Sequence, residues 1–421
     1  MSEGQNTLDR IRRSAVYRSV FRTPSYHSPR GRTERSFSNV FLHIYPARIP
    51  RSLLDFRSTF RLGFISTVLF VILFVTGVYL MFFYTPAVTM AYDDMQTLRS
   101  TVVFGQLMRN VHRWAAHLMV ITVVLHLIRV FLDGAYKAPR EFNWVIGVLL
   151  LAVTLAYSFT GYLLPWDQLS YWAVRVGSDL VQYAPGIGST LRGYVLGGDS
   201  IGQATLLRFY VLHTAVLTFA FFLLMAVHLW RIRKDGFALA PWRTDAANDM
   251  GQGAEEATTM ARRSLGRISV PLGHHSIRTP ENEAFSWPHL ILRHQVIALA
   301  TLALCIALGV AFEAPLREMA NPNLTPEPAK APWYFVGFQE LLAHFDPVVA
   351  GVIAPGVLFA ALLALPYVDR NPQRLPGARS LARYIFLLVV LALFTLTVIG
   401  ALFRGPGWVF VLPWEHLYLE L

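Results

Sequence analysis

The fold of this chain is decided by the segments HRWAAHLMVITVVLH, residues 112–126, and HTAVLTFAFFLLMAVH, residues 213–228. Each segment is mostly apolar and has a histidine at both ends, at positions i and i+14 in the first and at i and i+15 in the second. An α-helix turns about 100° and rises about 1.5 Å per residue, so these steps return a side chain to nearly the same face, roughly 21 to 22 Å along the axis. One membrane-embedded histidine is more often a polar core group, but four in matched pairs favour two stacked haem sites between facing helices.

The composition indicates an integral membrane protein. Of the 421 residues, 54% are hydrophobic and 13% aromatic, and the mean hydropathy is +0.42. Seven apolar runs are long enough to cross a hydrocarbon core of about 30 Å. They are Phe64 to Tyr84, Gln106 to Leu132, Val145 to Leu164, Leu206 to Trp230, His289 to Phe312, Val348 to Tyr367, and Tyr384 to Phe403. The runs are continuous rather than alternating, which favours helices over a β-barrel.

The spans fall into two groups, four before a polar stretch and three after it. We therefore predict an all-α integral membrane fold, in which a four-helix haem-binding bundle precedes a three-helix C-terminal module. The predicted domains are a basic N-terminal cytoplasmic segment (1–56), the four-helix di-haem domain (57–234), a polar linker (235–287) and the three-helix domain (288–421). The linker has no apolar period strong enough for a core of its own.

Loop charges set the expected orientation. Lys and Arg gather before the first span, between the second and third, after the fourth and before the seventh, and the opposite loops carry acidic residues. Because basic loops stay in the cytoplasm, the N-terminus is expected there. The formal net charge of +11 is therefore explained by the basic loops that orient the chain in the membrane, and no nucleic-acid partner is expected.

Cysteine use limits the metal chemistry of the chain. Cys305 is the single cysteine and lies within the fifth predicted span. One cysteine excludes a disulfide framework or a multi-thiolate site within this chain, so any iron–sulfur cluster must belong to a partner. Residues 1–60 lack an apolar h-region, and no cleavable signal peptide is expected.

Three arginines lie close to the outer histidines in the sequence. Arg109 and Arg113 flank His112, and Arg208 precedes His213 at the start of the fourth span. We predict that they pair with haem propionates at the membrane edge, although for each arginine taken alone a side chain that snorkels to the interface is the slightly favoured alternative. His117 lies about 140° around the helix from His112, so we interpret it as a structural side chain that faces elsewhere.

Four glycines repeat the interval of the histidines. Gly63 and Gly77 lie on the first span, and Gly147 and Gly161 on the third, and each pair has the same i, i+14 interval as His112 and His126. Small residues let a flat, bulky group approach the backbone. Ordinary small-residue helix packing is the alternative, but the shared interval favours clearance for haem.

Several motifs carry a resemblance to a known family. They are RNVHRW at 109–114, GYLLPWDQ at 161–168, the stretch 205–213, and PWYF at 332–335. Over most of residues 60–405 the chain resembles cytochrome b of the Rieske-type cytochrome bc complexes, the quinol oxidoreductases of respiration and photosynthesis. The wider spacing of the second histidine pair resembles the chloroplast type, whose four-span and three-span modules are separate polypeptides. Here they look fused, and the family's eighth span is missing.

The resemblance implies a function. By it, His112 and His213 bind a low-potential haem near the outer side, and His126 and His228 a high-potential haem near the cytoplasm. The chain would be the cytochrome b subunit of a quinol:cytochrome c (or similar acceptor) oxidoreductase. In its Q cycle, quinol gives one electron to a partner Rieske cluster and the other, through both haems, to an inner quinone, with net proton translocation.

The resemblance also implies partners and a location. The expected partners are a Rieske iron–sulfur protein, a c-type cytochrome subunit and membrane quinone, and the complex is expected to form a homodimer. We expect the chain in an energy-transducing membrane, the bacterial cytoplasmic membrane.

One motif departs from the family. Members usually carry Pro-Glu-Trp-Tyr in the outer quinol site, where the glutamate takes a proton, but this chain has Ala-Pro332-Trp333-Tyr334. Quinol cannot release its second electron easily without losing protons, so a base is needed. We predict Glu340 as that base, with Glu327 and His344 behind it. A solvated carboxylate at a helix start is an equal alternative for Glu340.

A second departure concerns the cytoplasmic side. The chloroplast type attaches an extra haem through a cysteine near the start of the first span, where this chain has Arg61. We therefore expect no third haem attached in that way. Arg61, Arg231 and Lys234 remain possible neighbours of haem propionates or of the inner quinone, and positive-inside anchoring explains them nearly as well.

Two other functions remain open. A haem-bearing anchor could pass electrons between a soluble dehydrogenase and quinone, but it would not need the loops around Trp166-Asp167 and Trp333-Tyr334. A transporter could use the histidines as a proton relay. The transporter would contain no haem, so an absorption spectrum separates it from the other two.

Overall fold

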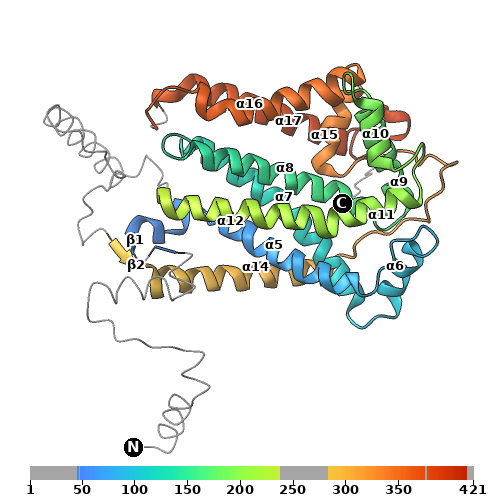
Figure 1. Cartoon of the computed structure of the whole chain (residues 1–421), viewed down its shortest axis with the longest axis horizontal. Helices are drawn as coiled ribbons and strands as arrows, with labels where there is room; N and C mark the ends of the chain where they lie inside the picture. Colours follow the sequence, from blue (N-terminus) through green and yellow to red (C-terminus); the bar gives the residue numbers. More distant parts are fainter. Residues whose placement is uncertain (1–44, 47, 238–282, 375–376, 415–421) are drawn as a thin grey trace, which may run out of the picture.

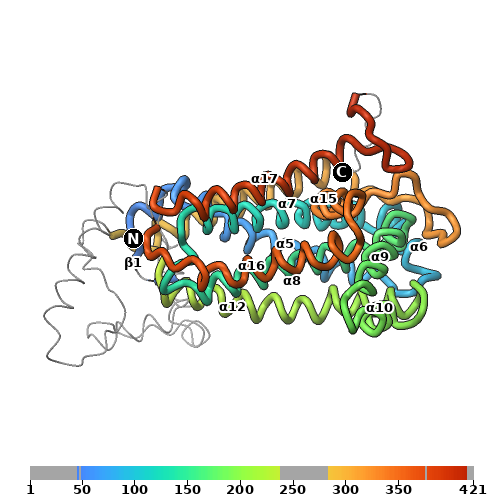
Figure 2. Tube along the Cα trace, turned by 90° about the horizontal axis from the view of Figure 1, so that it is seen from above, coloured from blue at the N-terminus to red at the C-terminus, as the bar shows by residue number. Residues whose placement is uncertain are grey.

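The computed structural model describes residues 45–46, 48–237, 283–374 and 377–414. In this part of the chain, seven helices are long and apolar enough to cross a membrane, and they run side by side along the long axis of the molecule (Figures 1 and 2). Their bounds are Leu62–Met81, Gly105–Leu132, Glu141–Leu163, Gln203–Asp235, Ser286–Ala311, Val348–Val368 and Gly377–Leu402. The prediction of an all-α membrane fold with seven spans is confirmed.

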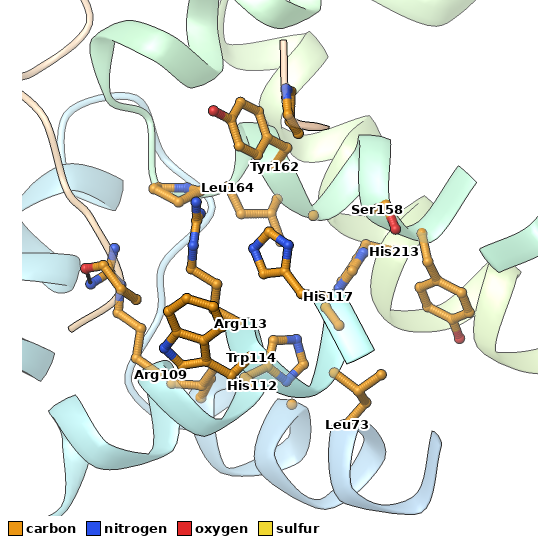
Figure 3. A pocket seen from close by; sticks show the side chains of 18 of the residues that line it. Leu73, Arg109, His112, Arg113, Trp114, His117, Ser158, Tyr162, Leu164 and His213 are labelled. Atoms are coloured by element: carbon orange, nitrogen blue, oxygen red, sulfur yellow. Dashed lines mark hydrogen bonds between the residues drawn. The ribbon is translucent and has the colours of Figure 1, made fainter. Parts of the chain in front are cut away.

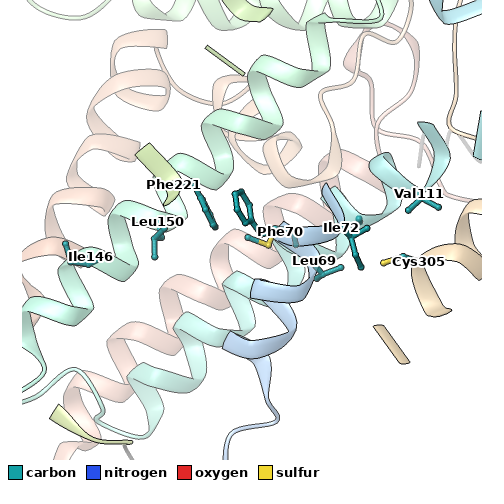
Figure 4. Packing of buried hydrophobic residues seen from close by; sticks show 10 residues of the cluster. Leu69, Phe70, Ile72, Val111, Ile146, Leu150, Phe221 and Cys305 are labelled. Carbon is teal, nitrogen blue, oxygen red and sulfur yellow. The ribbon is translucent and has the colours of Figure 1, made fainter. Parts of the chain in front are cut away.

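The first four spans form a bundle. It consists of α5 (Leu62–Met81), α7 (Gly105–Leu132), α8 (Glu141–Leu163) and a fourth span that contains α11 (Gln203–Val211) and α12 (Leu217–Asp235). In the middle of the bundle, Phe70 of α5 stacks on Phe221 of α12, with ring centroids 3.9 Å apart (Figure 4). Three members of this buried cluster lie between the histidines of a pair in the sequence, Ala115 and Met119 in the first pair and Phe221 in the second.

The fourth span is interrupted by a π-helical turn, η3 (Leu212–Val216), which contains His213. A π-turn closes its hydrogen bond over one more residue than an α-turn, so it takes up one extra residue without a new turn. This is the physical reason why the second histidine pair is one position wider than the first pair, which lies on uninterrupted α7.

The C-terminal spans lie on two sides of the bundle (Figure 1). The fifth span, η5 (Ser286–Leu290) and α14 (Ile291–Ala311), packs on α5 and α7. The sixth, η6 (Val348–Ile353) and α16 (Ala354–Val368), packs on α8, and the seventh contains η7 (Gly377–Arg379) and α17 (Ser380–Leu402). The three C-terminal spans therefore flank the four-helix bundle.

Short helices cap one end of the molecule (Figures 1 and 2). They are α6 (Ala91–Ser100), α9 (Gln168–Val181), α10 (Gly188–Leu196) and α15 (Trp333–Leu342), followed later in the chain by the 3₁₀ turn η8 (Pro406–Trp408). The loops that we predicted to be outer thus form structured surfaces around the ends of the spans.

The opposite end carries the basic connections. The strands β1 (Arg48–Pro50) and β2 (Glu283–Phe285) pair antiparallel there and lead through η1 (Arg51–Leu54) and η2 (Phe56–Ser58) to the first span. The connections α7–α8 and α16–α17 meet in an ion pair of 2.9 Å between Lys137 and Asp369. The basic loops therefore share one end, as the charge pattern predicts. Most of the predicted linker and of the N-terminal segment lies outside the described residues.

Candidate haem site and adjoining cavity

A cavity of about 620 Å³ opens between the four spans at the capped end of the bundle. His112 and His117 of α7 and His213 of the fourth span lie around it (Figure 3). Pro332, directly before α15, and Trp333 and Tyr334, at the start of this helix, close another side. The outer histidines and the proline-containing motif, which are far apart in the chain, thus share one cavity.

The imidazoles of His112 and His213 face each other with ring centroids 6.3 Å apart. Metal–imidazole bonds are about 2 Å long, so this separation leaves space for one iron bonded to a nitrogen of each ring. The Nδ1 atoms are engaged with threonine hydroxyls, His112 with Thr76 at 2.8 Å and His213 with Thr160 at 3.2 Å.

These threonines decide which ring nitrogen carries the proton. The Thr76 hydroxyl donates to the Ile72 carbonyl and the Thr160 hydroxyl to the Ala156 carbonyl, each at 2.8 Å. A hydroxyl has one proton, so each can only accept from its histidine. Both imidazoles therefore carry the proton on Nδ1 and present the lone pair of Nε2, the form that binds iron.

The inner pair differs from the outer pair in its hydrogen bonds. Nδ1 of His126 is buried and makes no hydrogen bond with the described part of the chain. An orphaned polar atom in an apolar bundle is costly and marks a site built for another group. His126 and His228 also have the glycine neighbours that the outer histidines have.

Each of the four glycines lies against one histidine ring. The distance from the position of an added Cβ to Cε1 is 3.1 Å for Gly63 and His126, 3.3 Å for Gly77 and His112, 3.6 Å for Gly147 and His228, and 2.6 Å for Gly161 and His213. We predicted clearance for a flat group. The structure shows that the clearance accommodates the imidazole of each predicted ligand, which explains the shared interval.

The predicted propionate partners lie in different surroundings. Arg109 and Arg113 line the cavity (Figure 3). The guanidinium of Arg109 also donates to the carbonyls of Ala314 and Pro315, at 2.8 and 2.7 Å, and so fixes the loop after α14. Arg208 is exposed, bonds the Tyr194 carbonyl and does not line this cavity. The interfacial alternative therefore describes Arg208 better.

His117 lines the cavity together with His112, but its ring faces Trp333 rather than His213, as its different angle on α7 predicts. Its Nδ1 accepts a 2.7 Å hydrogen bond from Nε1 of Trp333, and its ring centroid lies 5.9 Å from that of Tyr334. The cavity wraps around α7 far enough to include both of these helix positions. An ionisable side chain inside a span was the signal that could have identified it.

Tyr334 keeps its proton at neutral pH. Burial raises the pKa of its phenol to about 12, against the opposing charge of Arg113. Its hydroxyl is therefore a hydrogen-bonding group of the cavity and not a base.

Glu340 is not among the residues that line the cavity. It is fully buried at the end of α15, where Arg404 donates to both carboxylate oxygens, at 2.9 Å from Nε and 2.5 Å from Nη2. Nε1 of Trp408 lies 3.1 Å from Oε2, and Nε2 of His344 lies 2.9 Å from Oε1. This placement gives no support to Glu340 as the proton acceptor. It indicates a structural ion pair. This differs from both alternatives that the sequence offers, a proton acceptor and a solvated carboxylate at a helix start.

The electrostatics of Glu340 agree with that role. Burial alone would raise the pKa of the carboxyl, but the hydrogen bonds from Arg404, His344 and Trp408 hold it below its usual value. A carboxylate held in its charged form is a poor proton acceptor. Glu327, placed behind Glu340 in our prediction, is exposed and lies outside the cavity lining.

The inner-side cations also have protein partners. Arg61 is buried at the start of α5 and donates to the Leu53 carbonyl. Arg231 forms a 2.8 Å ion pair with Asp235, and the ammonium of Lys234 lies 5.2 Å from the ring centroid of Trp230. These contacts anchor the ends of the helices at the basic end of the molecule, and a role at an inner quinone stays a prediction.

A membrane bundle with facing histidine pairs, in which the outer imidazoles present Nε2 to a metal, is typical of the membrane-embedded b-type cytochromes. Comparison with known families agrees. Residues 51–236 match the family model described as "Cytochrome b/b6/petB", and residues 319–418 match "Cytochrome b(C-terminal)/b6/petD". This chain belongs to the cytochrome b/b6 family, with both domains on one polypeptide. Membership implies b haems and electron transport.

Individual relatives show how far the similarity extends. Cytochrome b6 of Prochlorococcus marinus strain AS9601 is 46% identical over 177 residues, which are 42% of this chain and 81% of that protein. Cytochrome b6 of Acaryochloris marina is 44% identical over 177 residues, 42% of this chain and 82% of that protein. A solved structure titled "Hyperthermophilic respiratory Complex III" shares the fold, with a TM-score of 0.72 at 23% identity over 95% of this chain and 92% of that one.

Proposed function

We propose that this chain is the quinol-oxidising subunit of a proton-translocating quinol:cytochrome c, or similar acceptor, oxidoreductase. The observation that carries the proposal is the cavity shared by His112, His213 and the Trp333–Tyr334 loop. A ligand beside Trp333 would lie next to the outer haem position. Electron transfer from quinol to the haem requires that these two groups lie close together.

The haem sites would be His112 with His213, and His126 with His228. Bound haems would supply one-electron transfer between the two faces of the membrane. The protein would hold each iron between two imidazoles, fix the outer rings through Thr76 and Thr160, and exclude water with the apolar layer around Phe70 and Phe221.

The cavity suits a flat quinol ring. Its lining is largely apolar and aromatic and includes Trp114, Trp333 and Tyr334, with a few polar groups that could fix orientation. Quinol oxidation releases two protons with two electrons, so the outer loops must also pass protons to solvent. Because Glu340 is ion-paired outside the cavity lining, it is poorly placed to accept these protons.

The remaining parts of the proposal follow from family membership and charge. One electron would pass to a Rieske iron–sulfur partner and on to a c-type cytochrome, and the other to quinone at the inner face, with proton uptake there. The basic end would face the cytoplasm of a bacterial cell by the positive-inside rule. Membership of the family leaves the non-haem transporter without support, and the structured outer cavity disfavours a simple haem anchor.

The test is single-turnover reduction of b haem by quinol in the purified complex, with the inner quinone site blocked. We expect wild type to show two b haems and rapid reduction. His112→Ala should lose one haem and this reduction, whereas His126→Ala should lose one haem and still allow reduction of the outer one. Equal loss of reduction in both variants, each with one haem left, would contradict the assignment of the outer site.

A further inference from the structure

His117 is the one histidine of α7 in the described structure that lines the cavity without a partner imidazole across the bundle. It comes from the helix that carries His112 and His126, but its ring lies against the start of α15. Its centroid is 6.3 Å from that of Trp333, with 25° between the ring planes, and 5.5 Å from that of Trp114. These aromatic neighbours fix the position of the imidazole.

The bond to Trp333 also fixes the proton of this imidazole. An indole N–H can only donate, so Nδ1 of His117 must be the acceptor of the 2.7 Å hydrogen bond. A neutral imidazole carries its single proton on the other nitrogen. His117 therefore presents an Nε2–H donor, and this atom makes no hydrogen bond within the described part of the chain.

His112 and His213 have the opposite form. Their Nδ1–H groups donate hydrogen bonds to threonine hydroxyls, so Nε2 carries a free lone pair. Three histidines of one cavity are thus set by their neighbours into two tautomers. Two are prepared to bind iron, and the third is prepared to donate a hydrogen bond.

The charges around His117 agree with a neutral donor. The cavity lining next to it contains Arg113 from its own helix, and Trp333 and Tyr334 from α15. The cavity carboxylates have other partners, because Asp167 accepts from the backbone of Ser170 and Arg317, and Glu313 forms an ion pair of 2.5 Å with Arg99.

We propose that His117 binds a ring oxygen of quinone or quinol as a hydrogen-bond donor through Nε2–H. The inference rests on the proposed function, because it places a quinone in this cavity. It assigns the oxygen-binding group of the outer site to a residue of the second span, held by the tryptophan of the altered Pro332-Trp333-Tyr334 motif. A donor favours the carbonyl of the oxidised ring over the hydroxyl of the reduced ring, since the carbonyl is the better acceptor.

The experiment measures binding rather than turnover. A short-chain naphthoquinone with ¹³C-labelled carbonyls is added to the haem-containing complex, and the labelled C=O band is recorded by infrared difference spectroscopy. Wild type should show a band moved to lower frequency by the hydrogen bond. His117→Phe should lose that band and bind the quinone about tenfold more weakly, the effect of one buried hydrogen bond. Its affinity for the quinol should fall less.

Two variants separate donation from packing. His117→Gln keeps an N–H donor and should retain part of the shifted band. Trp333→Phe removes the bond that fixes the tautomer, so the band should weaken although His117 remains. His344→Gln, a histidine outside the cavity lining, is the matched control and should leave the band unchanged.

The outcomes are distinguishable. If the quinone binds to His117→Phe with an unchanged band, the inference is overturned and the proposed function stands. If quinone and quinol lose affinity equally in His117→Phe and His117→Gln, the histidine only shapes the cavity, and the inference is again wrong. If wild type binds neither the quinone nor the quinol, the proposed function itself fails.

Discussion

Gly161 of α8 lies so close to His213 of the fourth span that a methyl group at Gly161 would be 2.6 Å from Cε1 of the imidazole. The ring cannot easily retreat, because Thr160, the neighbour of Gly161, holds its Nδ1 atom, and Tyr157 packs edge-on at 5.2 Å. The inner pair has more space, since a methyl group at Gly147 would lie 3.6 Å from Cε1 of His228.

We predict that Gly161→Ala and Gly147→Ala affect different haems to different degrees. The first should displace His213 and lose most of the outer haem, about half of the b-type absorbance. The second should retain both haems, because 3.6 Å is ordinary van der Waals contact. Reduced-minus-oxidised spectra of the two purified variants measure this. Equal haem content in the two variants would contradict the prediction, because it would show that the helices move apart enough to accept a methyl group at Gly161.

A second prediction concerns the ion pair of Glu340 and Arg404. Glu340→Gln leaves a guanidinium without its buried counter-charge, so the free energy of unfolding should fall by about 3 kcal/mol. Quinol-driven b-haem reduction in folded protein should keep the wild-type rate. Thermal unfolding followed by circular dichroism and single-turnover kinetics measure the two effects. A reduction rate that falls more than about tenfold, with stability intact, would restore Glu340 as the proton acceptor.

The same pair predicts an acid-sensitive stability. The pKa of Glu340 in the folded state lies below its usual value, which is about 4.3 in an unfolded chain. Its contribution is therefore fully present above the unfolded value and is lost as pH falls through the folded value. The stability difference between wild type and Glu340→Gln should be constant near neutral pH and shrink below about pH 4.3. Thermal unfolding of both proteins across the acid range tests this, and a difference that grows on acidification would contradict the sign.

The π-turn predicts an unusual tolerance for a deletion. Removing the exposed Ala215 from η3 should convert the turn to α-helix and give His213 and His228 the same interval as His112 and His126 on α7. Both haems should remain. Removing the exposed Ile121 from α7 should instead rotate His112 by about 100° against His126 and abolish at least one haem. Haem content per protein measures both, and loss of haem in the Ala215 deletion would show that the π-turn has another function.

Much of the site could be predicted because its residues recur at the period of an α-helix. The spacing of His112 and His126, and of Gly147 and Gly161, follows from the geometry of a single helix, so no tertiary information is needed to place each pair on one face. Continuous apolar runs predicted the seven spans for the same reason.

The roles of some residues depend on contacts between distant segments, which the sequence does not show. The angle of His117 on α7 separates it from His112, but its hydrogen-bond partner is Trp333, 216 residues later. Glu340 was chosen by its distance from a motif in the sequence, and Arg404, 64 residues further on, decides its state. Sequence distance from a motif does not report which side of a helix meets another.

The sequence by itself determined a seven-span membrane bundle with two histidine levels, because hydrophobic length and helical period are local properties of the chain. Only the tertiary structure decided which glycine meets which histidine, which nitrogen of His112, His117 and His213 carries the proton, and that Glu340 is ion-paired outside the cavity lining. These depend on hydrogen bonds and packing between different helices, which act over a few ångströms in space and have no fixed separation along the chain.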